Sequence, residues 1–247
     1  MPEKQPSILT HVFMKKSFQF LFLALLISTS SFSQSADADT DAKYFFSVVA
    51  GFNSVQLHSS GPIFEDTKFN SGYSFGLQFN LFPDYEFQQF YTRAAIYYSK
   101  EKSENETPVL IQGEPVRAKG DFSFANIEAF IAYRFAKQAT VDVYLGAGFL
   151  FQQKITKDDD AYRFIDTDGN EFPIFDRENL SLPLRFQSEG PKAALGPFAE
   201  LGAFVPVGNK LLGISTGVQY SYFKTNSSAK LNFEKTNLYL RVGYELF

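Results

Sequence analysis

Apolar and polar residues alternate along most of the chain, which is the period-two pattern of β-strands rather than the 3.6 period of helices. From Lys43 onward the alternation runs in long segments that turn-forming residues separate. Each segment has roughly 13 to 17 residues, well above the usual five or six of soluble strands and long enough to cross a bilayer at a tilt. The pattern predicts eight strands, over residues 43–56, 70–82, 88–101, 120–135, 140–154, 192–206, 210–225 and 231–247.

The connections between these strands alternate between short and long. A transmembrane barrel has this asymmetry, with tight turns on the periplasmic side and long loops outside. The last connection on the long side, at 225–229, is short and departs from the trend. The tight connections are 83–87, 136–139 and 208–210, and the long polar ones are 57–69, 102–119 and 155–191.

Charged residues in the middle of the strands all fall in the polar row. A charge in the lipid-facing row at the bilayer midplane would cost about 2 to 4 kcal/mol, so a membrane-spanning strand keeps its charges on the other face. The polar row is also rich in Gly, Ser, Asn and Gln and poor in the Lys and Glu of water-facing strands. The mid-strand charges are Arg93, Glu128, Arg134, Asp142, Glu200, Arg241 and Glu245.

These features predict an all-β fold, a transmembrane antiparallel up-and-down β-barrel of eight strands with the polar row inside. A soluble lipocalin-like barrel, with the polar row outside, is the alternative that alternation alone leaves open. A ten-strand barrel is also open, with a hairpin at 160–175 lengthened into the wall. Pro197 lies in the apolar row and lacks an N–H, which predicts a bulge or a later strand start at that position.

The amino end has the pattern of a secretory signal. Lys15 and Lys16 precede an apolar run at 17–28, and small and polar residues follow it. This run is shorter than the roughly 20 residues of a membrane-spanning helix. We therefore expect a signal peptide at 1–34 with Met14 as the true start, a flexible lead-in at 35–42 and the barrel domain at 43–247.

Composition excludes several classes of partner and chemistry. The net charge of the 247 residues is −4, and it becomes −6 without residues 1–34, which carry three lysines and one glutamate. No basic stripe is present to neutralise a phosphate backbone, so nucleic acid is not an expected partner. With no Cys the chain cannot be a lipoprotein or hold a cysteine metal site. With no Trp, any aromatic girdle must consist of Tyr and Phe, such as Tyr73, Tyr98, Tyr133, Tyr220, Tyr222 and Tyr244.

The stretches VDVYLGAGFLF (141–151) and LRVGYELF (240–247) resemble small outer-membrane β-barrel proteins of the Bacteroidota type. These form the outer membrane protein beta-barrel domain family, with its PorT-like and porin-family members. The resemblance covers about 43–247 and implies the outer membrane of a Gram-negative bacterium, with outer-membrane lipid, lipopolysaccharide and the barrel assembly machinery as partners. Phe247 resembles the terminal aromatic that this machinery recognises, although it falls in the same row as Arg241.

Four of the mid-strand charges are expected to meet inside the barrel. Arg93 and Glu128 lie at mid-depth on neighbouring strands, and Glu200 and Arg241 lie at a similar depth on the sixth and eighth strands. An eight-strand barrel is just narrow enough for its side chains to fill it. Because unpaired buried charges are costly, we expect an ion-pair network across the lumen. A gated narrow pore or a proton path is the other interpretation of these charges.

Enzymatic and metal chemistry have little support in the sequence. His58 is the one histidine after the predicted signal. Outer-membrane lipid A deacylases use a His and a Ser, and the barrel wall must hold such groups in place. His58 falls instead in the predicted first loop. The acidic run 157–172 fails the calcium-loop pattern because Phe164 occupies the first ligand position. It predicts instead a hairpin that turns at Asp168 and Gly169. No catalytic residue, metal or cofactor is expected.

The predicted function is therefore non-enzymatic. We expect a role in envelope structure, in recognition of an extracellular ligand or envelope protein through the long loops, or in both. Porin-like transport through a narrow lumen is the alternative, and a lipid-modifying enzyme that uses His58 is a third hypothesis.

Overall fold

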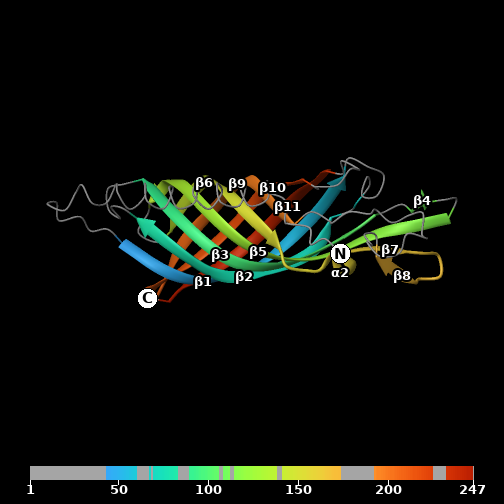
Figure 1. Ribbon diagram of the computed structural model, residues 1–247. Coiled ribbons are helices and arrows are strands. Elements are labelled where there is room, and N and C mark those ends of the chain that lie inside the picture. The colour runs from blue at the N-terminus through green and yellow to red at the C-terminus, as the bar shows by residue number, and fades with distance from the viewer. Residues whose placement is uncertain are drawn as a thin grey trace, which may run out of the picture.

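Eight long antiparallel strands form a closed barrel in the computed structural model (Figure 1). The structure describes residues 43–59, 67, 69–82, 89–105, 108–111, 114–137, 141–173, 192–224 and 232–246. The barrel strands are β1 (Lys43–Ser59), β2 (Asn70–Phe82), β3 (Phe90–Glu104), β5 (Glu114–Lys137), β6 (Asp142–Lys154), β9 (Ala193–Val207), β10 (Lys210–Lys224) and β11 (Asn232–Glu245).

The ring closes because the first strand pairs with the last, and each of the other barrel strands pairs with the barrel strands before and after it in the chain. β1 pairs with β11 from Ser47 opposite Glu245 to Ser59 opposite Phe233, and β3 pairs with β5 along its whole length. Every pairing in the ring is antiparallel, so the wall presents no open edge that would leave backbone groups unpaired in lipid. The predicted eight-stranded up-and-down barrel is confirmed.

The barrel is apolar outside and polar inside. On the outer surface Phe52 is 76% exposed and Ile96 is 66% exposed, whereas Glu128 and Glu200 inside are each 1% exposed. A soluble barrel has the opposite arrangement, because an apolar row on its outer surface would be exposed to water. The assignment of the polar row to the lumen is therefore correct, and the wall has the surface that lipid requires.

The expected long loop at 102–119 is wrong, because most of it is strand. β3 continues to Glu104 and β5 begins at Glu114, so β5 has 24 residues. Beyond the end of β3, β5 pairs with β4 (Val109–Ile111). The other edge of β5 pairs with β7 (Tyr162–Ile165), and β7 in turn pairs with β8 (Glu171–Pro173). These four segments form a small sheet beyond the ring, which we call the extension (Figure 1).

Buried apolar side chains explain why β5 continues past the ring. Val116 and Ala118, on the inward row of β5, are 3% and 0% exposed and belong to one cluster with Phe164 of β7 and Phe233 of β11. Residues of the outward row, Arg117 among them, are solvated. The alternation that defines the barrel wall thus persists into the extension.

The first and third predicted loops also contain ordered structure. β1 runs on to Ser59, and Thr67 bridges to Asn105 and donates its hydroxyl to the Leu57 carbonyl. Residues 155–173 contain a single helical turn, α2 (Asp158–Ala161), before the β7–β8 hairpin. No helix among the described residues is long and apolar enough to cross a membrane.

The predicted hairpin turn at Asp168 and Gly169 is confirmed. Gly169 has φ +85°, which only glycine adopts without strain, and Asp166 accepts hydrogen bonds from the backbone N–H groups of Asp168 and Asn170. The hairpin pairs only with the upper end of β5, so it adds no strand to the ring. The ten-strand alternative is therefore wrong.

Pro197 interrupts a ladder without shifting its register. β9 starts before it, at Ala193, so the predicted later start is wrong. The β9–β10 ladder stops at Phe198 opposite Gln219 and resumes in the same register at Leu195 opposite Tyr222. No bulge forms, because the missing proline N–H removes a hydrogen bond without inserting a residue.

A charge on the outer wall tests this polarity. Phe149 of β6 is 64% exposed and lies opposite Ala129, beside the level of Glu128, so Phe149→Arg places a charge at mid-depth in lipid. We expect a loss of about 2 to 4 kcal/mol in the free energy of unfolding from phospholipid vesicles. Ile155→Arg, at the exposed upper end of the same wall, is the control and should change it by less than about 1 kcal/mol. Equal, small effects would mean that the wall faces water.

Candidate functional site

The structure brings the four predicted lumen charges together at mid-depth. Arg93 of β3 holds Glu200 of β9 with two hydrogen bonds, from Nη1 to Oε1 at 2.6 Å and from Nη2 to Oε2 at 3.0 Å. Arg241 of β11 donates from Nη1 to both oxygens of Glu128 of β5, at 2.8 and 2.9 Å. Arg93 also lies 3.5 Å from Glu128, which joins the two pairs into one network.

Three tyrosines complete this network, and sequence analysis did not identify them. The hydroxyls of Tyr144 and Tyr239 each donate to Glu200 at 2.9 Å. The Tyr97 hydroxyl donates to Glu128 at 2.7 Å and accepts from Arg241 Nη2 at 2.9 Å. Each of the three tyrosines belongs to an inward row that also carries buried polar side chains. The alternation along each strand could therefore have identified them as lumen residues. We call the four charges and three tyrosines the central network.

Glycines in the inward rows make room for these tyrosines. A Cβ at Gly202 would lie 2.3 Å from the Tyr144 hydroxyl oxygen, and one at Gly217 would lie 2.5 Å from the Tyr239 hydroxyl oxygen. Both distances are far below van der Waals contact. The phenols can reach Glu200 because the wall has no side chain at these two positions.

The central network is neutral and leaves no room for a substrate. Two guanidinium groups balance two carboxylates, and the arginine side chains are 3 to 4% exposed. A cavity of about 10 Å³ borders Arg93 and Arg241, which is space for roughly one water molecule. Each buried charge of the network is thus paired with an opposite charge, which offsets the cost of its burial.

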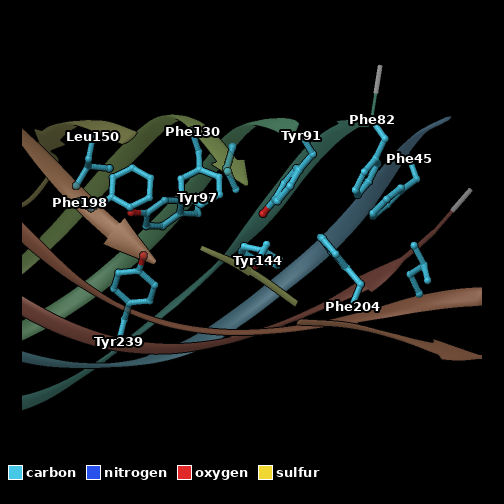
Figure 2. Close-up of a cluster of buried hydrophobic side chains, with 13 residues drawn as sticks. Phe45, Phe82, Tyr91, Tyr97, Phe130, Tyr144, Leu150, Phe198, Phe204 and Tyr239 are labelled. Carbon is cyan, nitrogen blue, oxygen red and sulfur yellow. The ribbon is translucent and has the colours of Figure 1, made fainter. Parts of the chain in front are cut away.

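Packed rings fill the lumen on the side of the tight turns. Phe45, Phe82, Tyr91 and Phe204 contact one another with ring centroids 5.1 to 5.8 Å apart (Figure 2). The Arg134 guanidinium stacks 4.9 Å from the Phe82 ring centroid, and its Nε donates to Asp142 at 2.7 Å. We call this layer, with Tyr144 and Phe130 behind it, the lower plug.

A second packed layer lies at the opposite end, below the extension. Lys235 of β11 donates to Glu101 of β3 at 2.8 Å, both side chains are 1% exposed, and the ammonium lies 4.6 Å from the Phe124 ring centroid. Above this pair, an apolar cluster joins the barrel mouth to the extension. It contains Leu57, Val116, Ala118, Phe122, Phe124, Ala161, Tyr162, Phe164, Ala194, Phe223 and Phe233. We call the pair and this cluster the upper plug.

The residues of the less favoured hypotheses are dispersed. The prediction that His58 lies in the first loop is wrong. His58 lies on β1 in register with Glu234 of β11, and its side chain is exposed. Among the described residues no group of three or more His, Asp or Glu side chains is arranged to hold a metal ion. Phe247, the predicted assembly signal, lies outside the described residues.

A polar groove lies on the outside of the wall, where the extension leaves the barrel. Its volume is about 210 Å³, and it is lined by Lys100, Lys119, Asp121, Ser123, Thr156, Asp160, Arg163 and Glu171. Glu171 accepts from Lys119 at 2.6 Å and from Arg163 at 2.9 Å, and these hydrogen bonds lower the pKa of its carboxyl below the ordinary value. The Glu171 carboxylate therefore joins two cations of the groove, Lys119 and Arg163.

Neutralising one member of the central network tests its pairing. Glu200→Gln leaves the Arg93 guanidinium buried against a neutral amide, and we expect it to lower the free energy of unfolding by about 3 to 5 kcal/mol. Adding Arg93→Met removes the unpaired charge, so the double variant should lose at least about 1 kcal/mol less than the sum of the single variants. Glu104→Gln, at a partly exposed pair with Arg117, is the control and should cost less than about 1 kcal/mol. Additive losses would contradict the network.

Comparison with known proteins gives only distant similarity. No protein-family model matches the chain, and no curated protein matches it. Among solved structures, the chain is similar to Ail, the attachment invasion locus protein of Yersinia pestis, in complex with the heparin analogue sucrose octasulfate. The two sequences are 12% identical, the TM-score is 0.35, and the match covers 83% of this chain and 99% of Ail. The chain is also similar to the translocator domain of the autotransporter NalP from Neisseria meningitidis, at 12% identity and a TM-score of 0.28, with a match that covers 93% of this chain and 97% of that one. At these values the architecture rests on the strand pairing of this chain itself.

Proposed function

We propose that this chain is an integral outer-membrane β-barrel of a Gram-negative bacterium, non-enzymatic and non-conducting, that presents its extension and surface loops for recognition. The observation that carries the proposal is a wall that is apolar outside around a lumen that side chains fill at three levels. Membership of the Bacteroidota-type family of small outer-membrane barrels, and export by cleavage near residue 34, belong to the same proposal and rest on the sequence patterns above.

The orientation follows from the connections. The ends with the tight turns, including the Gly208 turn between β9 and β10, would lie in the periplasm together with the carboxyl end of β11. The extension would then lie outside the cell, where long segments are tolerated. Outer-membrane lipid and lipopolysaccharide would surround the wall, and an extracellular ligand or envelope protein would contact the extension.

The filled lumen favours recognition over transport. An ion that crossed the barrel would have to pass the lower plug, the central network and the upper plug in turn. The central network alone contains two charged pairs whose separation would leave buried charges without partners, which costs several kcal/mol. A gap beside the central network has room for about one water molecule.

Conductance in planar bilayers tests this proposal. The refolded full chain should give no resolved current steps, because side chains of the described residues fill its lumen at three levels. Heat-dependent gel mobility of the same sample establishes that the barrel is folded, and a porin reconstituted in parallel establishes that channels would be detected. Reproducible single-channel steps from the folded protein would contradict the proposal and favour narrow-pore transport.

A further inference from the structure

The groove on the outside of the wall lies at the height of lipid headgroups. On the outward row of β3, Ile96 is 66% exposed, and Tyr98 and Lys100 follow at two-residue intervals. Ile96 lies opposite Ile127, beside the level of Glu128, so it is at mid-depth. The four residues from Ile96 to Lys100 rise by about 9 to 11 Å along a tilted strand, and the apolar band of such a barrel ends about 12 Å from mid-depth. The Lys100 backbone therefore lies near the edge of the apolar band, and its long side chain can extend into the headgroup layer.

Register pairs place the floor of the groove beside exposed tyrosines of the outer wall. Lys100 lies opposite Tyr73 of β2 on one side and opposite Ser123 of β5 on the other. Tyr73 is 47% exposed, and the Tyr98 hydroxyl lies 2.8 Å from Ser123 Oγ. The groove is thus continuous with the lipid-facing wall, and a molecule that fills it is most directly supplied from the membrane.

The chemistry of the groove suits a sugar rather than a simple phosphate. Its lining offers three cationic donors, three carboxylate acceptors and two hydroxyls, in a volume of about 210 Å³. Sugar hydroxyls both donate and accept hydrogen bonds, so they can satisfy both kinds of group. A headgroup with only phosphate would meet repulsion from Asp121, Asp160 and Glu171. The volume is also below the roughly 300 Å³ at which pockets for drug-sized molecules begin.

We propose that this groove binds a saccharide headgroup of a glycolipid in the outer leaflet, with Lys100, Asp121 and Ser123 as its membrane-side contacts. The inference rests on the proposed function, because that function places the extension on the outer-leaflet side. The Lys100 ammonium and the Asp121 carboxylate are 3.4 Å apart and are each about one third exposed. A sugar hydroxyl can therefore approach both groups without breaking a tight buried pair.

Native mass spectrometry of the full chain, folded in detergent micelles, tests the proposal with lipid A as the glycolipid probe. Cardiolipin is the lipid control, because it carries two phosphates and acyl chains but no sugar ring. The variant Lys100→Gln with Asp121→Asn keeps the net charge, and it should weaken lipid A binding about tenfold through the loss of charge-assisted hydrogen bonds. Cardiolipin binding should not change.

A charge-neutral control variant excludes a general electrostatic effect. Lys192→Gln with Glu234→Gln alters two exposed residues at the same end of the barrel that do not line the groove, and it should leave lipid A binding within about twofold of the parent chain. Deacylated lipid A should bind at least about tenfold more weakly than lipid A, because its chains no longer contact the apolar wall.

Several results would overturn the inference. These are unchanged lipid A binding in the Lys100→Gln, Asp121→Asn variant, equal loss of cardiolipin binding, or deacylated sugar that binds as tightly as the glycolipid. Each of these results can be distinguished from a result that refutes the proposed function. A barrel that conducts ions yet binds lipid A through the groove would refute the closed lumen alone, and a silent barrel without the groove effect would refute the saccharide site alone.

Discussion

The absence of water around the wall is the constraint on which the rest of the structure depends. Lipid supplies no hydrogen-bond partner, so every backbone group of the wall must pair within the sheet, and only a closed ring achieves this. The ladder between the first strand, β1, and the last, β11, meets that requirement. The same constraint places apolar side chains outside and polar side chains inside, because each strand must direct its charges into the lumen.

The inward charges then have to be neutralised in a narrow, dry space. Arg93 and Arg241 each take a carboxylate from another strand, and three phenols satisfy the remaining acceptor positions. Packed rings lie on either side of this layer, together with the buried pairs of Arg134 with Asp142 and of Lys235 with Glu101. Pairing across the lumen also connects strands that are far apart in the ring, which makes the interior one packed unit.

The sequence was sufficient to predict the eight strands of the ring and their two faces, because period-two alternation reports directly on a wall between lipid and lumen. The alternation placed Arg93, Glu128, Glu200 and Arg241 in the lumen. It gives the inward or outward direction of a side chain, but not which residues face each other across a barrel. That depends on the stagger between strands, which alternation does not encode. For this reason the Lys235 and Glu101 pair, 134 residues apart in sequence, was not foreseen.

The upper part of β5 was missed for a different reason. Residues 102–119 are rich in charges and contain two prolines, which is the composition of a loop. Yet Val116 and Ala118 alternate with Arg117 and Lys119, and this short alternation was the signal of the extension. It was too brief to outweigh the polar composition, and only the buried cluster beneath the sheet shows why these residues are strand.

The most direct test of the account is a nitroxide scan along β11 in phospholipid vesicles. The chain has no Cys, so single cysteines at residues 238, 240 and 242 carry the label without further changes. These side chains point outward and are 44 to 50% exposed. The account predicts that all three labels collide readily with oxygen, which partitions into lipid, and poorly with a water-soluble nickel complex. Ready collision with the nickel complex at these positions would contradict a lipid-facing wall.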